Sequence, residues 1–223
     1  MVSHYREDAA HVSANVLTKE SLTFSRLLST TQLVDRGFYR RPTLDVAPDL
    51  LGKVIVHKVD GHVLAARIVE TEAYLGNGDR AAHSARGLTK STQVIFGPPG
   101  HAYVYLCYGM YECMNLVVEP DGQAGCVLIR AVEPLLGMEE IQRRRPKAKR
   151  PRDLASGPGK LTRALGVTRE RNGVDVTRGE LTVRAMHRPE LFEVVTTTRV
   201  GISVSQDLPY RFYIKDNEHV SKH

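Results

Sequence analysis

The sequence predicts an α+β domain whose core is built from antiparallel strands. Two β-hairpin patterns and several short helical patterns support this class. Of the 223 residues, 42% are hydrophobic and 25% are charged, fractions that are typical of a globular protein and exclude disorder throughout the chain. A domain of this length buries about 70% of the surface of its extended chain, so it needs no disulfide or metal to fold.

The first hairpin pattern flanks Asp60-Gly61, a dipeptide typical of a two-residue turn. The two strand runs are residues 53–59 and 63–71. If the second strand is regular, its alternation puts Glu70 and Glu72 on the same face as apolar Ile68. A carboxylate on an apolar face conflicts with burial preference, and such conflicts often mark functional sites. The alternative is a strand that frays at Glu70 and leaves both acids in solvent.

The second hairpin pattern has strand runs at 102–107 and 113–118, with Gly109 at the expected turn. Several tyrosines in this segment fit core packing or cross-strand pairing, the usual roles of strand aromatics. Tyr108 differs, because the core cannot cover a ring at the tip of a hairpin. An aromatic residue at such a tip often meets a partner, and a nucleic-acid base is one candidate.

Further elements are expected downstream: an apolar strand at 125–131, a helix beginning at 134–138, a helix that opens at Gly157-Pro158-Gly159 and ends at Leu165, and strands at 199–204 and 210–214. Arg130 ends the apolar strand and should have a carboxylate or ligand partner. The Gly-Pro-Gly turn either starts a helix and nothing more, or presents free N–H groups to a phosphate. It lacks the GxxxxGK[ST] spacing of a nucleoside-triphosphate loop.

Positive charge is concentrated in the basic run, residues 143–152. The chain has 31 Lys and Arg, and seven of them lie in this run, which contains no acidic residue. The remainder has 24 basic residues against 25 Asp and Glu, so the net charge of +6 comes from this run. A patch of this kind indicates a polyanionic partner, and a solvated loop without a partner is the alternative.

Domain boundaries and compartment also follow from composition. Residues 1–35 are expected to be a flexible appendage and residues 36–223 the folded domain. The three cysteines, Cys107, Cys113 and Cys126, match no metal-ligand spacing and are expected to be reduced thiols of an intracellular protein. No apolar run reaches the roughly 18 residues of a membrane span, and the N-terminal segment does not match a secretory signal.

Six sequence blocks occur in a characteristic order: LLGKVIV at 50–56, RIVETEAYLGNGDRAAHSARG at 67–87, GHAYVYLCYGMYECMN at 100–115, CVLIRAVEP at 126–134, ASGPGKLTRALGV at 155–167, and the final pair RVGISV and YRFYI. In this order they resemble the alkyladenine (3-methyladenine) DNA glycosylase family. The resemblance implies a single α+β domain with a curved antiparallel sheet, surrounding helices and a protruding hairpin.

The resemblance also implies the site residues. Glu72 matches a general base that activates water, and Arg130 matches an arginine that helps to hold this water. A backbone carbonyl of the last strand also holds the water in the family, and Ile214 is its nearest match. The base pocket matches Tyr74, His83, Tyr105 and Asn115. The expected DNA contacts are the wedge residue Tyr108 with its neighbours Gly109 and Met110, and the basic residues Arg143, Arg144, Arg145 and Lys160.

The implied activity is that of a monofunctional DNA glycosylase without lyase activity. Such an enzyme flips alkylated or deaminated purines out of double-stranded DNA and leaves an abasic site. A buried base must leave the stack before reaction, and the oxocarbenium-like transition state needs an anion and a poised water, which one carboxylate provides. No metal or other cofactor is expected. The protein is expected to be an intracellular, DNA-associated monomer.

Two alternatives come from other functional classes. A glycoside or nucleoside hydrolase would use Glu70 and Glu72 as an acid–base pair, since residues two apart on a strand face are roughly 6.5–7 Å apart. A non-catalytic nucleic-acid-binding module would use Glu72 only structurally. Hydrolysis of undamaged sugar substrates would favour the first alternative, and DNA binding without base release would favour the second.

Overall fold

One antiparallel sheet of nine strands organises residues 19–221, the part of the chain that the computed structural model describes. The strands are β1 (Thr31–Leu33), β2 (Val54–Val59), β3 (His62–Leu75), β4 (Ala102–Cys107), β5 (Tyr111–Val117), β6 (Gly125–Leu136), β7 (Leu181–Met186), β8 (Val194–Thr197) and β9 (Arg211–Ile214). Their order is β1-β7-β2-β3-β6-β5-β4, with β9 paired to β3 and β8 to β9. The predicted α+β class is confirmed.

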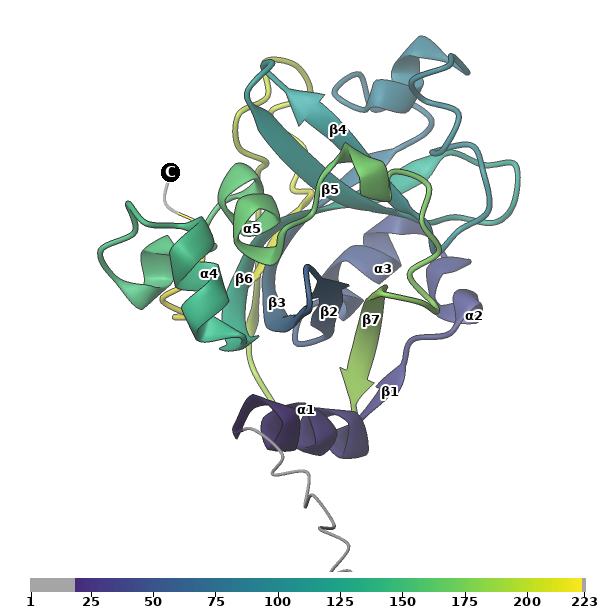
Figure 1. Ribbon diagram of the computed structural model, residues 1–223. Helices are drawn as coiled ribbons and strands as arrows, with labels where there is room; N and C mark the ends of the chain where they lie inside the picture. The colour runs from purple at the N-terminus through teal and green to yellow at the C-terminus, as the bar shows by residue number, and fades with distance from the viewer. Residues whose placement is uncertain (1–18, 222–223) are drawn as a thin grey trace, which may run out of the picture.

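Five α-helices and three short 3-10 helices are described around this sheet (Figure 1). The α-helices are α1 (Lys19–Thr30), α2 (Arg36–Tyr39), α3 (Thr43–Asp49), α4 (Met138–Arg144) and α5 (Pro158–Leu165), and the 3-10 helices are η1 (His83–Arg86), η2 (Pro151–Asp153) and η3 (Arg169–Arg171). α3 contacts β3, β6 and β9, whereas α5 contacts β5 and β6 and packs against α4.

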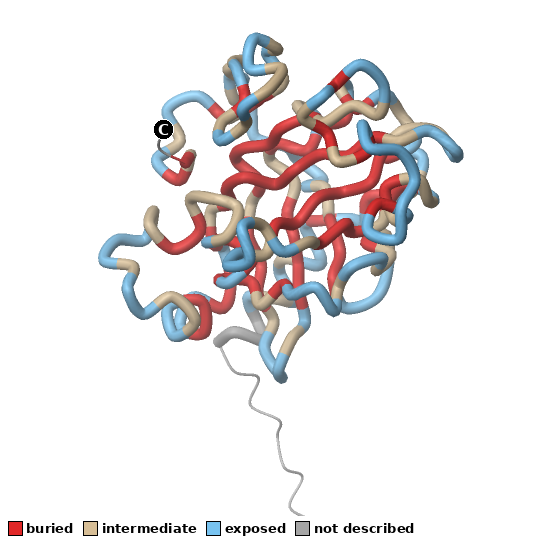
Figure 2. The backbone as a smooth tube through the Cα atoms, turned by 90° about the horizontal axis from the view of Figure 1, so that it is seen from above, coloured by how far each residue is buried: buried red, intermediate tan, exposed pale blue. Residues whose placement is uncertain are grey.

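The main core joins α3 and α5 to the central strands. Its fully buried members include Val46 and Ala47 of α3, Leu161 and Leu165 of α5, and Ile129 of β6. Figure 2 shows this as buried central strands surrounded by exposed loops. Burial of these apolar side chains is the dominant stabilising contribution.

The β2–β3 hairpin is confirmed. Val59 pairs with His62 across Asp60 and Gly61, whose φ angles are 51° and 77°. Two successive positive φ angles define a type I′ turn, whose twist matches that of the strands on either side. The strongest local signal in the sequence therefore forms the turn it predicted.

The alternation along β3 is interrupted at Glu70, so the expectation of a regular strand is wrong. The register between β3 and β6 shifts on both sides of this residue. Before the shift, even-numbered Ile68 packs into the main core; after it, odd-numbered Ala73 does, and the Thr71 hydroxyl donates to a carbonyl of α3. Glu72 therefore lies on the face away from this core. Irregularities of this kind re-aim side chains and are common beside active sites.

The β4–β5 hairpin is also confirmed, and it protrudes from the molecule (Figure 1). Cys107 pairs with Tyr111, so the loop consists of Tyr108, Gly109 and Met110. The side chain of Tyr108 is 79% exposed, and its φ of 50° lies in the left-handed region. The ring is thus held at the tip, outside the core.

Two expectations about the second half of the chain need correction. The strand expected to end at residue 131 continues to Leu136. The next helix begins at Met138, inside the range expected for its start. The extended strand, β6, passes through Pro134 at a register shift, where a strand tolerates the missing N–H. Residues 199–204 form no strand, because Arg199 and Val200 bond the side chains of other segments instead. The predicted helix ending at Leu165 and the strand YRFYI are confirmed.

The division of the chain at residue 35 remains a prediction, with one correction. Thr31–Leu33 pair with β7, so they belong to the sheet of the domain rather than to an appendage. Side chains of α1, Phe24 and Leu27, pack against a small second cluster on β2 and β3. Residues 1–18 lie outside the described residues.

Candidate active site

Glu72 is a fully buried carboxylate in the middle of the sheet. Its Oε1 accepts a hydrogen bond from the Val200 N–H at 2.8 Å, and its Oε2 accepts one from the Tyr74 hydroxyl at 2.9 Å. The Arg130 guanidinium lies 3.3 Å from Oε1. The alternative of a frayed strand is therefore wrong, since Glu70 and Glu72 are both 0% exposed within β3.

Burial raises the pKa of Glu72 above its ordinary value. Desolvation penalises the ionised form more than the surrounding groups, Arg130, the Val200 N–H and the Tyr74 hydroxyl, stabilise it, and Glu70 adds a further increase. A raised pKa moves a carboxylate toward the range in which a general base accepts protons effectively.

Glu70 accepts more hydrogen bonds from protein groups than Glu72 does. Its Oε1 accepts from Arg130 at 3.1 Å, from Arg211 at 2.6 Å and from the Ser221 hydroxyl at 3.0 Å, and its Oε2 accepts from the Ser221 N–H at 2.8 Å. This bonding gives Glu70 a structural role and argues against an acid–base pair with Glu72.

Arg130 has the carboxylate partners that the sequence predicted. It contacts both Glu70 and Glu72, and its Nη1 donates to the Val200 carbonyl at 3.4 Å. The backbone N–H that bonds the Glu72 side chain and the carbonyl that bonds Arg130 thus both belong to Val200. Ile214, the expected match for the carbonyl position, lies in β9 and pairs with Val194 of β8 instead. The sequence contained no signal that would place residue 200 beside β3.

The aromatic residues form a second group on the same side of the sheet. The rings of His83 and Tyr105 lie 4.5 Å apart between centroids, and the His83 Nδ1 is 2.9 Å from the Tyr103 hydroxyl. Burial lowers the pKa of His83, which favours its neutral imidazole. A neutral imidazole can stack beside a cationic base without charge repulsion.

Asn115 lies in the same cross-strand row as Glu72. The register pairs Tyr103 with Asn115, Asn115 with Leu128, and Leu128 with Glu72. Residues paired across antiparallel strands point to the same face, and a separation of two strands spans about 10 Å. Asn115 is 3% exposed, and its Nδ2 donates to the Tyr103 carbonyl at 3.1 Å. The sheet thus brings the predicted pocket residues to one face.

The hairpin tip and the basic residues line one groove of about 880 Å³ between β4–β5, α4 and α5. α5 lies close to the hairpin because Gly159 has no side chain: a Cβ there would be 2.8 Å from that of Tyr111. The Thr162 hydroxyl donates to the Glu112 carbonyl at 2.9 Å and holds the two elements together. Lys160, on the first turn of α5, lines the groove.

The three consecutive arginines of the basic run differ in their availability. Arg144 is 16% exposed and bonded to Glu140 and Asp60, whereas Arg143 is 70% exposed and bonded to Glu140. The hydrogen bonds from Arg143 and then Arg144 lower the pKa of Glu140 to about 2. Arg145 donates to a backbone carbonyl within its own loop. Of the first two arginines, Arg143 is the one exposed to a partner.

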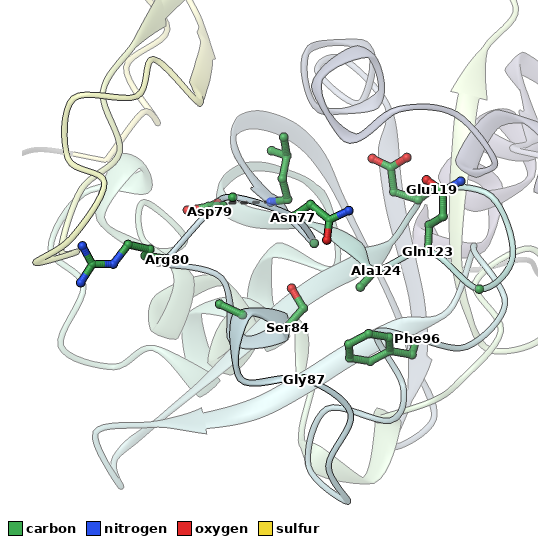
Figure 3. A pocket seen from close by; sticks show the side chains of 14 residues that line it. Asn77, Asp79, Arg80, Ser84, Gly87, Phe96, Glu119, Gln123 and Ala124 are labelled. Carbon is green, nitrogen blue, oxygen red and sulfur yellow. Dashed lines mark hydrogen bonds between the residues drawn. The ribbon is translucent and has the colours of Figure 1, made fainter.

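A separate pocket of about 730 Å³ lies beyond the end of β3. Figure 3 shows Glu119 and Gln123 together, apart from Ser84 and Phe96. Glu119 and Gln123 belong to the loop before β6. None of the predicted site residues lines this pocket.

Among the described residues, no group of three or more His, Cys, Asp and Glu side chains is placed to hold a metal ion. All three cysteines are unpaired thiols. No helix between residues 19 and 221 is long and apolar enough to cross a membrane.

The chain is similar to known proteins over most of its length. A family model described as methylpurine-DNA glycosylase matches residues 37–218. The chain is 49% identical over 202 residues to a protein of Alkaliphilus oremlandii named "Putative 3-methyladenine DNA glycosylase", covering 85% of this chain and 98% of that protein. A protein of the same name from Methanocella arvoryzae is 49% identical over 194 residues, covering 85% and 96%. The residues that the family model matches include β2 to β9 and the candidate site.

Proposed function

The chain belongs to the methylpurine-DNA glycosylase family and is thus a DNA-repair glycosylase of the base-excision pathway; on this premise we propose that it flips alkylated or deaminated purines out of double-stranded DNA and hydrolyses their N-glycosidic bond with water activated by Glu72. The observation that carries the proposal is the buried Glu72 carboxylate, held by Arg130, Tyr74 and the Val200 N–H.

In the proposed reaction, a water oxygen attacks C1′ of the deoxyribose while Glu72 takes its proton. The C1′–N bond breaks, and its electron pair leaves with the base, so a cationic alkylpurine departs as a neutral molecule. The ionised Glu72 also stabilises the oxocarbenium-like transition state. Arg130 and the Val200 carbonyl hold the water beside the carboxylate, a role supported by their direct contact.

The proposed base pocket lies on the face that carries Glu72. Tyr74 stacks on the flipped base, with His83 opposite and Tyr105 as a further wall. Asn115, buried two strands from Glu72, discriminates against the exocyclic amine of guanine. Selectivity for damaged bases also arises because a weakly paired base costs less to flip.

The proposed DNA interface is the groove beside the hairpin. Tyr108, with Gly109 and Met110, enters the duplex where the base has left, and Lys160 and the basic run contact phosphates. The exposure of Tyr108 and Arg143 supports these roles. We propose that the protein acts inside the cell as a monomer without a metal or cofactor, and that water rather than a lysine amine is the nucleophile, so it has no lyase activity.

Replacement Glu72→Gln tests the proposal. Gln keeps the shape of the side chain but cannot accept a proton, so single-turnover excision from lesion-containing duplex should fall 10²–10⁴-fold with little loss of DNA binding. Glu133→Gln is the matched control, since Glu133 is another arginine-paired carboxylate of the sheet, on β6. Unchanged excision by Glu72→Gln would refute the assignment. Lesion binding by the parent protein without base release would instead support a non-catalytic binding module.

A further inference from the structure

Arg199 is a buried guanidinium in the segment after β8, outside the set of predicted site residues. Its side chain is 0% exposed and that of its partner, Asp79, is 1% exposed. The pair is bidentate, with Nη1 to Oδ2 at 2.6 Å and Nη2 to Oδ1 at 2.8 Å. The desolvation of two charges offsets much of their attraction, so a pair buried this deeply contributes little to folding by itself.

Asp79 connects this pair to the elements that carry the predicted base pocket. It lies in the turn between β3 and η1. Its Oδ2 accepts a hydrogen bond from the Leu75 N–H at 3.2 Å, drawn as the dashed line in Figure 3, and its Oδ1 accepts one from the Ala81 N–H at 3.1 Å. Tyr74 precedes this turn and His83 follows it. The Asp79 carboxylate therefore fixes the turn that joins the two residues.

The Arg199 guanidinium also covers one face of an aromatic ring of the site. Its Cζ lies 4.6 Å from the centroid of the Tyr74 ring and 5.4 Å from that of Tyr210. The Nη1 donates to the Ala73 carbonyl at 2.9 Å, on the strand next to Tyr74. A planar cation over a ring adds an attraction and restricts the orientation of that ring.

The next residue places its backbone against the carboxylate proposed as the base. The Val200 N–H donates to Glu72 at 2.8 Å, and the Val200 carbonyl accepts from Arg130 at 3.4 Å. This segment pairs with no strand, so the anchored side chain of Arg199 is what holds the adjoining peptide in position. One ion pair thus links the Val200 peptide, the Tyr74 ring and the turn to η1.

We propose that Arg199 and Asp79 form a positioning pair, which sets the Val200 N–H against Glu72 and the Tyr74 ring against the flipped base. The inference rests on the proposed function, in which Glu72 acts on water. Neither member of the pair touches the reacting atoms. Their effect passes through Val200 and Tyr74.

The electrostatics around Glu72 determine what loss of the pair does. The ionised form of Glu72 is opposed by burial and by Glu70, and it is favoured by Arg130, the Val200 N–H and the Tyr74 hydroxyl. The charge of Arg199 lies farther away, beyond the Tyr74 ring. A displaced Val200 N–H removes one stabilising hydrogen bond. The pKa of Glu72 then rises further, and its basic form is lost at a higher pH.

Arg199→Lys is the first test, because it keeps the charge but loses the bidentate fork and the flat stacking surface. Single-turnover excision of 7-methylguanine from duplex DNA should be at least tenfold slower, and the acidic limb of its pH profile should move up by about one unit. The dissociation constant for duplex carrying an abasic-site analogue should change less than threefold. Arg36→Lys, in the remote Arg36–Asp175 pair, is the matched control and should leave the limb in place.

A second variant removes both charges. In Asp79→Leu/Arg199→Met, apolar side chains of similar size replace the pair, an exchange that often preserves folding. It should fold, as judged by its melting curve, yet show the slow rate and the shifted limb. A folded variant of either kind with the parent rate and pH profile would overturn the inference, as would a loss confined to DNA affinity. A parent protein without any excision would instead refute the proposed function.

Discussion

Replacement of the hairpin-tip residue, Tyr108→Ser, separates DNA insertion from packing. The ring is 79% exposed, so its removal from the free protein should change the free energy of unfolding by less than about 0.5 kcal/mol. The φ of 50° is equally unfavourable for Ser and Tyr, so the backbone strain is unchanged. The expected loss therefore appears only in the complex, where the ring would fill the space left by the flipped base.

The magnitude follows from the stacking that is lost. An aromatic stack on a base contributes about 1–3 kcal/mol, which corresponds to a decrease of about 5- to 150-fold in excision under subsaturating conditions. Glu72 and Arg130 are untouched, so bond cleavage after flipping should keep its rate. The loss should be largest for a stably paired lesion and small for the same lesion in a bulge, where flipping is already easy.

The assay compares paired and bulged hypoxanthine in single-turnover excision, together with the melting temperature of the variant. Leu191→Ser is the control, because Leu191 is another exposed apolar side chain, 96% accessible, far along the chain from the hairpin. Equal rate losses on both substrates, with a clear drop in melting temperature, would make Tyr108 a packing residue and refute the reasoning.

Three further predictions concern acid dependence, phosphate contacts and the nucleophile. Burial raises the pKa of Glu72, so the rate of excision should decline with falling pH at a limb above 4.5. A pH–rate profile with 7-methylguanine, whose base needs no added proton, measures this limb. A limb at or below 4.5 would contradict the prediction. Arg143→Ala should flatten the slope of log affinity against log salt concentration by about 0.9. The side chain of Arg144 is mostly buried, so Arg144→Ala should lower the melting temperature and change the slope less. Borohydride should trap no covalent protein–DNA adduct during excision, as gel analysis will reveal, because a Schiff base requires an amine nucleophile.

Local signals predicted the elements that depend on neighbours in sequence. Asp60-Gly61 predicted a turn because both positions adopt positive φ, and the ends of α5 and β9 follow their local patterns. The strand at Leu181–Met186 was missed, and so was its pairing with β1, because short strands gain their stability from partners distant in the chain. The same reason explains why residues 199–204 were wrongly expected to form a strand.

The sequence by itself determined the fold class, the family and the two carboxylates on β3, since these depend on residue types and their order. Only the tertiary structure decided how differently the two carboxylates are surrounded. Arg211 and Ser221, far along the chain, bond Glu70 in addition to Arg130. Glu72 meets a single guanidinium, one backbone N–H from residue 200 and the hydroxyl of its neighbour Tyr74. Hydrogen bonding and desolvation depend on side chains that meet only after folding, so the different surroundings of two identical residues follow from the packed structure.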